Sequence, residues 1–447
     1  MQQWLPGPAV SAWRRKMRMK LNKSSQLVLV SAASLIGAGL ITSCATLTVD
    51  FVYITSSKAA GANNYGEVDV MEVNSESGRL RKIPTSPFPS GGRDPVAEAV
   101  GSNYANLYVV NEDDNNIVQF AIGNDGKLYP QNTVNTPGVF PMAVAVHGSR
   151  LFVLDTYQPL PSCSPAEPCS GSIAVFPLSS TGQPGAAVGN PSGNINYWPL
   201  TLPCSATDVL TPTAINVLSS GSLLYVTVYD ATAAANNASA EPVSSGCDTA
   251  GKGTSPTGYL FAYSVGSDGV LSALKGSPLV VAANGASGVG VNPNAIASDP
   301  GGQYAWITDF ANGVVYGYAV TSGLPKELSG KPFATGSQPA AITVDPTGSY
   351  AYVANSLDNT ITAYTIDAGT LTSFGTFATT TQPVAVLVDP STGNFVYAAG
   401  YLGASAAGFE LIPGNPPTLY VTQQAPYATD AQPTAMAAIP HGTTTTK

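Results

Sequence analysis

A strand-like pattern recurs along most of this chain. The segment Gln338 to Leu371, QPAAITVDPTGSYAYVANSLDNTITAYTIDAGTL, predicts three short strands, and a fourth, SFGTFAT, follows after the DAGTL turn. Asp-Pro, Gly and Asn between alternating apolar residues are typical of tight turns that join antiparallel strands. The pattern then starts again at QPVAVLVDPSTGNFVYAAG. A four-stranded unit that repeats about every 40–50 residues predicts the blades of a β-propeller.

Three series of residues count the repeats. The first strands share a Pro-x-Ala start, at Pro95, Pro141, Pro212, Pro293, Pro339, Pro383 and Pro433. The second strands share an aromatic residue, at Tyr53, Tyr108, Phe152, Tyr225, Trp306, Tyr352 and Tyr397. The third strands carry Phe120, Phe176, Tyr263, Tyr318, Tyr364 and Phe409. Because the series keep one order, the sequence predicts an all-β, seven-bladed β-propeller with four antiparallel strands per blade.

The ends of the array predict a closed ring. The chain enters at a second strand, Asp50 to Ser56, and leaves on a first strand, Gln432 to Pro440. The C-terminal strand is therefore expected to complete the N-terminal blade and to remove the exposed sheet edges of an open array. This interpretation makes residues 49–440 one propeller domain, followed by a tail of residues 441–447.

Residues 1–43 have the pattern of an export signal. Six basic residues precede an apolar stretch from Leu27 to Leu40. The stretch ends in Ile41-Thr42-Ser43-Cys44, which resembles the bacterial lipobox, and the resemblance implies lipidation of Cys44 with residues 44–48 as a short tether. By resemblance to enterobacterial lipoproteins, Ala45 favours the outer membrane. The alternatives are an uncleaved anchor helix or a plain signal peptide.

Charge excludes some partners. Without residues 1–43, 12 Lys and Arg remain against 27 Asp and Glu. Such an acidic surface repels nucleic acid and anionic lipid, so we expect membrane contact only through the lipid anchor. We expect a monomer with no cofactor and no metal, since the acidic run at Glu112 lies in a turn and lacks the ligand spacing of a calcium loop.

Four further cysteines predict disulfides. An even number in an exported protein favours bridges, and four cysteines allow three pairings. We favour Cys163–Cys169 and Cys204–Cys247. Zinc is the alternative, but no histidine lies nearby.

The long insertions predict a binding face. They fall at 57–65, 157–170, 185–211, 230–257 and 282–292, each between a second and a third strand or between an outer strand and the next inner one. These connections share one end of a propeller, which we call the loop face. Variable loops on a rigid scaffold often carry binding sites.

The motifs Tyr352-Val353-Ala354-Asn355 and Leu107-Tyr108-Val109-Val110-Asn111 resemble those of the seven-bladed lactonase family, which includes bacterial 6-phosphogluconolactonases, and of YVTN-repeat propellers. The resemblance covers residues 49–440 and implies lactone hydrolysis by His and Arg at the starts of inner strands, as in Gly-Pro-Arg-His. Here the position of that His is alanine in every blade: Ala97, Ala143, Ala214, Ala295, Ala341, Ala385 and Ala435. The acid–base groups of the family have no counterpart at these positions.

Glu98 is the exception among the inner strands, because the other six blades have Val, Ile or Met at its position. A carboxylate there needs a partner or a raised pKa. We expect it to pair with Arg93, either as a structural ion pair or as a ligand-contacting and possible catalytic pair at the mouth of the ring. Further candidate ligand contacts end the second strands and are otherwise turn caps: Asn111, Asp155, Asp309 and Asn355.

These observations favour a lipid-anchored propeller in the cell envelope that binds a small molecule or an envelope protein at the loop face. Its two histidines, His147 and His441, follow inner strands at the opposite end, where we expect exposed turn residues. A lactone hydrolase and a structural envelope protein remain the alternatives.

The lipobox interpretation predicts that Cys44→Ser releases the protein into the soluble fraction or leaves it unprocessed, because the lipid attachment site is gone. Membrane fractionation with immunoblotting measures this. Membrane-bound protein of mature size in the variant would contradict lipidation at Cys44.

Overall fold

The computed structural model describes residues 48–60, 63–203, 208–230, 258–281, 291–320, 323–328 and 332–441. Cys44, Cys204 and Cys247 lie outside these residues, so their predicted lipidation and disulfide stay predictions. Within the described ranges, no helix is long and apolar enough to cross a membrane.

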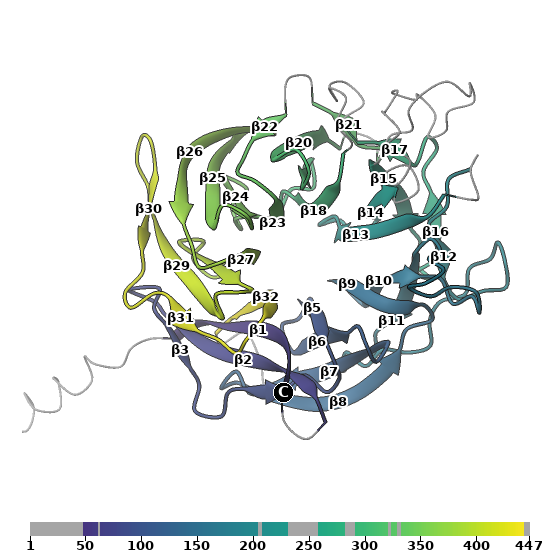
Figure 1. Ribbon diagram of the computed structural model, residues 1–447, viewed down its shortest axis with the longest axis horizontal. Helices are drawn as coiled ribbons and strands as arrows, with labels where there is room; N and C mark the ends of the chain where they lie inside the picture. Colours follow the sequence, from purple (N-terminus) through teal and green to yellow (C-terminus); the bar gives the residue numbers. More distant parts are fainter. Residues whose placement is uncertain are drawn as a thin grey trace, which may run out of the picture. The chain divides into compact units, whose positions relative to one another are not determined.

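Seven antiparallel sheets follow one another around a ring, with one strand of each sheet facing the centre (Figure 1). We number the sheets as blades 1 to 7 along the chain. The predicted seven-bladed, all-β fold is confirmed, with four strand positions in each blade.

The inner strands of blades 2 to 7, and then of blade 1, are β5 (Pro95–Val100), β9 (Val139–His147), β13 (Leu210–Val217), β18 (Pro293–Ser298), β23 (Pro339–Val344), β27 (Pro383–Val388) and β32 (Pro433–Pro440). The second strands of blades 1 to 7 are β1 (Thr48–Ala60), β6 (Asn106–Asn111), β10 (Arg150–Tyr157), β14 (Leu223–Asp230), β19 (Tyr304–Asp309), β24 (Tyr350–Asn355) and β28 (Phe395–Gly400).

The third strands are β2 (Tyr65–Asn74), β7 (Asn116–Ile122), β11 (Ser172–Pro177), β15 (Gly258–Val265), β20 (Val314–Ala319), β25 (Thr360–Asp367) and β29 (Ser405–Ile412). The outer strands are continuous in blades 2, 3 and 6: β8 (Leu128–Asn135), β12 (Trp198–Pro199) and β26 (Thr370–Ala378). In the other blades they are split: β3 (Leu80–Lys82) and β4 (Phe88–Pro89), β16 (Leu271–Ala273) and β17 (Leu279–Val280), β21 (Lys326–Glu327) and β22 (Phe333–Ala334), β30 (Thr418–Val421) and β31 (Tyr427–Ala428).

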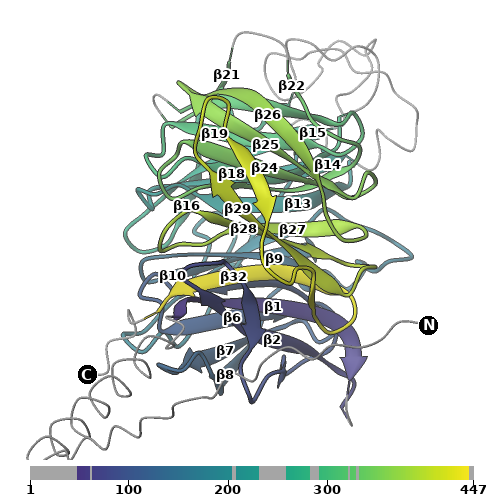
Figure 2. The same ribbon diagram turned by 90° about the vertical axis from the view of Figure 1, so that its left-hand side faces the viewer.

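Blade 1 contains both ends of the ring. Strand β32 pairs with β1 in an antiparallel ladder that runs from Asp50 opposite Pro440 to Ser56 opposite Pro433 (Figure 2). The predicted closure by the C-terminal strand is therefore confirmed. Every residue of β1 from Asp50 to Ser56 is buried, whereas β32, the inner strand at the end of this sheet, is buried at some positions and partly exposed at others.

The core lies between blades. The second strands are buried on both faces, and all six residues of β6 are buried, because each face of a blade packs against a neighbouring blade. This explains why the second strands are almost continuously apolar and do not alternate between apolar and polar residues.

The aromatic residue of the second strand forms a hydrogen bond between neighbouring blades. In five blades its side chain donates to a glycine carbonyl in the turn between the third and outer strands of the next blade. The bonds are Tyr53–Gly126 (3.2 Å), Tyr108–Gly182 (2.6 Å), Tyr225–Gly323 (2.6 Å), Trp306–Gly369 (3.0 Å) and Tyr397–Gly78 (2.6 Å). All five glycines have a positive φ, a backbone conformation that glycine adopts without the strain a side chain introduces. We call these bonds the interblade ties.

The other two blades lack this tie. Blade 3 has Phe152 at the position, which has no hydroxyl, and Arg150 of the same strand instead donates to the Ser267 carbonyl of blade 4. Blade 6 has Tyr352, whose hydroxyl is buried without a hydrogen-bond partner.

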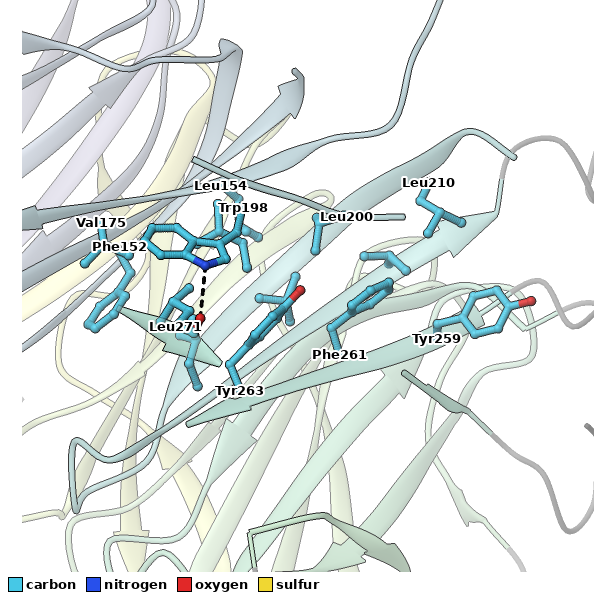
Figure 3. Packing of buried hydrophobic residues seen from close by; sticks show 14 of the residues in the cluster. Phe152, Leu154, Val175, Trp198, Leu200, Leu210, Tyr259, Phe261, Tyr263 and Leu271 are labelled. Carbon is cyan, nitrogen blue, oxygen red and sulfur yellow. Dashed lines mark hydrogen bonds between the residues drawn. The ribbon is translucent and has the colours of Figure 1, made fainter. Parts of the chain in front are cut away.

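Part of the insertion at 185–211 does not decorate the loop face, contrary to the sequence prediction. Its residues Trp198 and Pro199 form the outer strand β12, and Trp198, Leu200 and Leu202 are buried against blade 4. The Trp198 indole donates a 3.0 Å hydrogen bond to the Leu271 carbonyl (Figure 3). The insertion therefore enlarges the core between blades 3 and 4, where the usual tie is missing.

The ties predict a contrast between two similar substitutions. Tyr397→Phe leaves the buried Gly78 carbonyl without its donor and should lower the free energy of unfolding by about 1–2 kcal/mol. Tyr352→Phe removes a hydroxyl that has no partner, so it should be neutral or stabilising. Denaturant unfolding of both variants measures this, and an equal loss in both would contradict the role of the ties.

Candidate functional site

The polar residues that end the second strands are used inside the blades. Asn111, Asp155, Asp309 and Asn355 are all 0% exposed. In the strand pairing, each lies opposite the proline of the Pro-x-Ala motif in the inner strand of its own blade. Their side chains therefore lie under the connection that enters the inner strand, within the described part of the chain.

Hydrogen bonds show what these side chains do. The Gly138 amide donates to Asp155 Oδ2 (3.1 Å), the Asn292 amide to Asp309 Oδ1 (3.1 Å) and the Gly336 amide to Asn355 Oδ1 (3.0 Å). Asn111 donates through Nδ2 to Asn116 Oδ1 at 2.9 Å. At Gly138 a Cβ would lie 2.3 Å from the Asp155 Cβ, so glycine is required for the connection to reach the carboxylate. Turn capping, the alternative prediction, describes their contacts.

The predicted pairing of Arg93 with Glu98 is wrong. The Arg93 side chain is 49% exposed and binds Asp114, with Nε 2.7 Å from Oδ1, while the Arg93 amide donates to Asp114 Oδ2 at 2.8 Å. Asp114 follows the second strand of the same blade, so Arg93 fastens one loop-face turn to another. An exposed ion pair of this kind contributes little to stability.

Glu98 points from β5 towards blade 1. Its Oε2 accepts a 2.7 Å hydrogen bond from the Thr55 hydroxyl of β1, while Oε1 is buried without a partner. Although the residue as a whole is only partly buried, burial of its carboxyl group raises the pKa to about 8. Glu98 is therefore mostly a neutral acid at pH 7, held between blade 2 and the blade that closes the ring.

Sequence reasoning missed two other buried acids on β1 and β2 of blade 1. Asp50 accepts a hydrogen bond from Ser391 of blade 7, and burial together with nearby Asp389 raises its pKa to about 7. Asp69 lies 2.6 Å from the Lys82 ammonium and accepts the Asp430 amide at 2.8 Å. The sequence signal that could have identified them is the same as for Glu98, namely an acidic residue within an apolar strand.

The starts of the inner strands also serve the contacts between blades. Six of the seven alanines at the position of the family's His pack against the apolar clusters between blades, namely Ala97, Ala143, Ala214, Ala295, Ala341 and Ala385. One residue earlier, Asn294 donates to the Ala340 carbonyl (2.9 Å) and Thr434 to the Pro95 carbonyl (2.9 Å), each in the next blade.

The remaining chemical candidates are not assembled into a catalytic group. His147 ends β9 and His441 follows β32, both at the end opposite the loop face, where the His441 ring lies 5.4 Å from that of Phe51. Among the described residues, no three His, Cys, Asp or Glu are grouped so as to hold a metal ion. The predicted Cys163–Cys169 disulfide is present in the loop between β10 and β11 of blade 3.

A closed ring of seven four-stranded blades defines the class as a seven-bladed β-propeller. A family model described as lactonase, seven-bladed beta-propeller, matches residues 51–192 and 305–415, which is more than half of the chain. The chain belongs to this lactonase family. The unmatched residues 193–304 include blade 4 and β12, the outer strand that packs on it.

Solved structures support the same fold. The chain is similar to the periplasmic gluconolactonase of Pseudomonas aeruginosa, with 16% identity, a TM-score of 0.63 and coverage of 88% of this chain and 99% of that one. A proposed 6-phosphogluconolactonase of Bacteroides fragilis gives 16% identity, a TM-score of 0.62 and coverage of 88% and 99%. At such identity the similarity shows the fold and leaves activity open. None of the curated protein sequences matches the chain.

The buried acids predict a pH dependence of stability. Burial raises the pKa of Glu98 to about 8 and of Asp50 and Asp155 to about 7. Between the ordinary pKa of a carboxyl, about 4, and these raised values, the folded protein keeps protons that the unfolded chain has released. The free energy of unfolding should therefore fall as the pH rises from about 4 to about 8, and then level off.

Glu98→Gln tests one of these groups. Between about pH 5 and pH 8, the melting temperature of the variant should fall less than that of the wild type, because a titrating acid has been removed. At the higher pH, Glu98→Val should melt at or above the wild-type temperature, since an apolar side chain needs no partner there. Glu76→Gln, at an exposed glutamate, is the control. A wild-type pH slope in Glu98→Gln would contradict the raised pKa.

Proposed function

We propose that this chain is a lipid-anchored binding module of the bacterial cell envelope, and that its loop face contacts an envelope protein through an apolar surface. The observation that carries the proposal is a pair of exposed leucines. Leu357 and Leu402 are 62% and 66% exposed, and they lie in corresponding turns between the second and third strands of blades 6 and 7. Exposed apolar groups on a rigid rim favour contact with a protein partner.

The charge on the loop face argues against an anionic ligand. Asp94, Glu112 and Asp113 lie together beside blade 2, and the negative charge of Asp113 adds to burial in raising the pKa of both Asp94 and Glu112. Arg93 of this region already forms an ion pair with Asp114. A phosphorylated sugar acid lactone would meet negative potential there, so the substrate class of the 6-phosphogluconolactonases fits this face poorly.

Lactone hydrolysis is the competing function, and membership of the lactonase family favours it. The residues described at the inner-strand starts argue against hydrolysis at these positions, because they bond or pack against neighbouring blades. The full chain should give no turnover of phosphorylated or unphosphorylated sugar lactones above that of buffer in a pH-stat. Turnover that is lost in Glu98→Gln or Arg93→Ala would overturn the binding-only proposal.

The leucine pair gives a direct test of the binding face. Immobilised full chain should retain one stoichiometric envelope protein from the cells that produce it, and the Leu357→Ser/Leu402→Ser variant should bind that protein at least roughly tenfold more weakly, a loss of about 1.4 kcal/mol. The control is Tyr104→Ser/Tyr129→Ser, which removes exposed aromatic groups away from these turns. Titration of the identified partner measures the affinities. Equal binding by all three proteins would refute the assignment of the face.

A further inference from the structure

The outer strand of each blade has one edge that faces away from its sheet. In four blades this strand is split into pieces of two to four residues, and in blade 3 it is the two-residue strand β12. Short and interrupted edges are one way in which β proteins prevent pairing with another chain. Five of the seven blades are protected in this way.

Among the outer strands that the structure describes, only β8 and β26 are long and continuous. Strand β8 contains Pro130, which lacks an amide hydrogen, and follows directly on Lys127. Strand β26 has nine residues with neither a proline nor a charge, and it lies at the outer rim (Figure 1). Within the described part of the chain it pairs only with β25. A bulge at Phe374 interrupts the pairing with β25, but β26 itself runs without a break from Thr370 to Ala378, unlike the split outer strands.

The sequence around β26 is nearly free of charge. Between Ala368 and Thr429 only Asp389 and Glu410 are charged, and Asp389 is fully buried. The whole chain has a net charge of −9, so two copies carry net charge of the same sign and repel each other. That repulsion is weakest where blades 6 and 7 meet the rim.

The neighbouring outer strand adds exposed apolar area. Tyr420 and Val421 of β30 are 62% and 67% exposed, which places them among the most exposed large apolar residues of the described chain. On the side of β26 that faces blade 7, Phe377 packs against Phe409, with ring centroids 6.4 Å apart. We call β26 together with Tyr420 and Val421 the neutral rim.

We propose that the neutral rim is the interface for a second copy of this chain, which adds its own β26 antiparallel to the first. A two-fold axis brings the same edge of each copy to the other, so that the unpaired amide and carbonyl groups satisfy one another. Tyr420 and Val421 of each copy then lie at the flanks of the joined sheets. This proposal revises the monomer expected from the sequence, and it does not involve the loop face.

The test is a charge placed on the free strand. Thr376 of β26 and Thr133 of β8 occupy corresponding exposed positions, paired with Thr362 and Val118 of their third strands. Thr376→Lys puts an ammonium group on each of the two joined strands, whereas Thr133→Lys makes the same change on the strand that contains Pro130. The pair therefore separates the effect of the site from that of the charge.

Sedimentation equilibrium of the detergent-solubilised full chain should show a monomer–dimer equilibrium. Its dissociation constant should rise roughly tenfold or more in Thr376→Lys, corresponding to about 1.4 kcal/mol, and stay unchanged in Thr133→Lys. Amide hydrogen exchange in β26, but not in β8, should slow as the protein concentration rises. A wild-type monomer at the highest soluble concentration, or a dimer that both variants weaken equally or not at all, would overturn the proposal.

Discussion

The ladder between β1 and β32 is the interaction on which the other contacts depend. It joins residues from opposite ends of the domain, and without it both strands would expose unpaired edges in the middle of the core. Three of the buried acids contact this ladder or the connection that leads into it. Asp50 lies on β1, Glu98 accepts a hydrogen bond from Thr55 of β1, and Asp69 holds the connection that leads into β32. Opening the ladder would hydrate all three groups together, so closure and acid burial form one cooperative unit.

The remaining joints of the ring differ in how they are held. Most blades donate an aromatic tie to a glycine turn of the next blade, and apolar clusters fill the space between them. Between blades 3 and 4 the tie is replaced by Arg150 and by the apolar segment that contains Trp198. The family model stops just before this segment, at residue 192. The gap in the family match, residues 193–304, contains this segment together with blade 4.

Sequence patterns predicted the architecture because the repeats share characteristic residues in their turns and strands. Pro-x-Ala, the second-strand aromatic and the Asp-Pro turns set blade number, strand order and closure. They were less informative about side-chain direction. Sequence position alone placed four residues at the mouth of the ring: Asn111, Asp155, Asp309 and Asn355. In the structure their side chains are buried beneath the connection that enters the inner strand. Arg93 was paired with Glu98 because the two are close in sequence, but Asp114, contributed by a different turn, holds the arginine. Contacts between distant segments decide such partners.

The ties have a direction. In each tie the donor belongs to one blade and the acceptor to the next blade around the ring. For all but one of the ties, the acceptor is therefore synthesised after the donor. Tyr397 is the exception, because its acceptor, Gly78, is made 319 residues earlier. That bond, like the pairing of β32 with β1, joins the part of the propeller that is synthesised last to the part that is synthesised first. Blade 1 therefore lacks its inner strand until the C-terminal end of the propeller has been made.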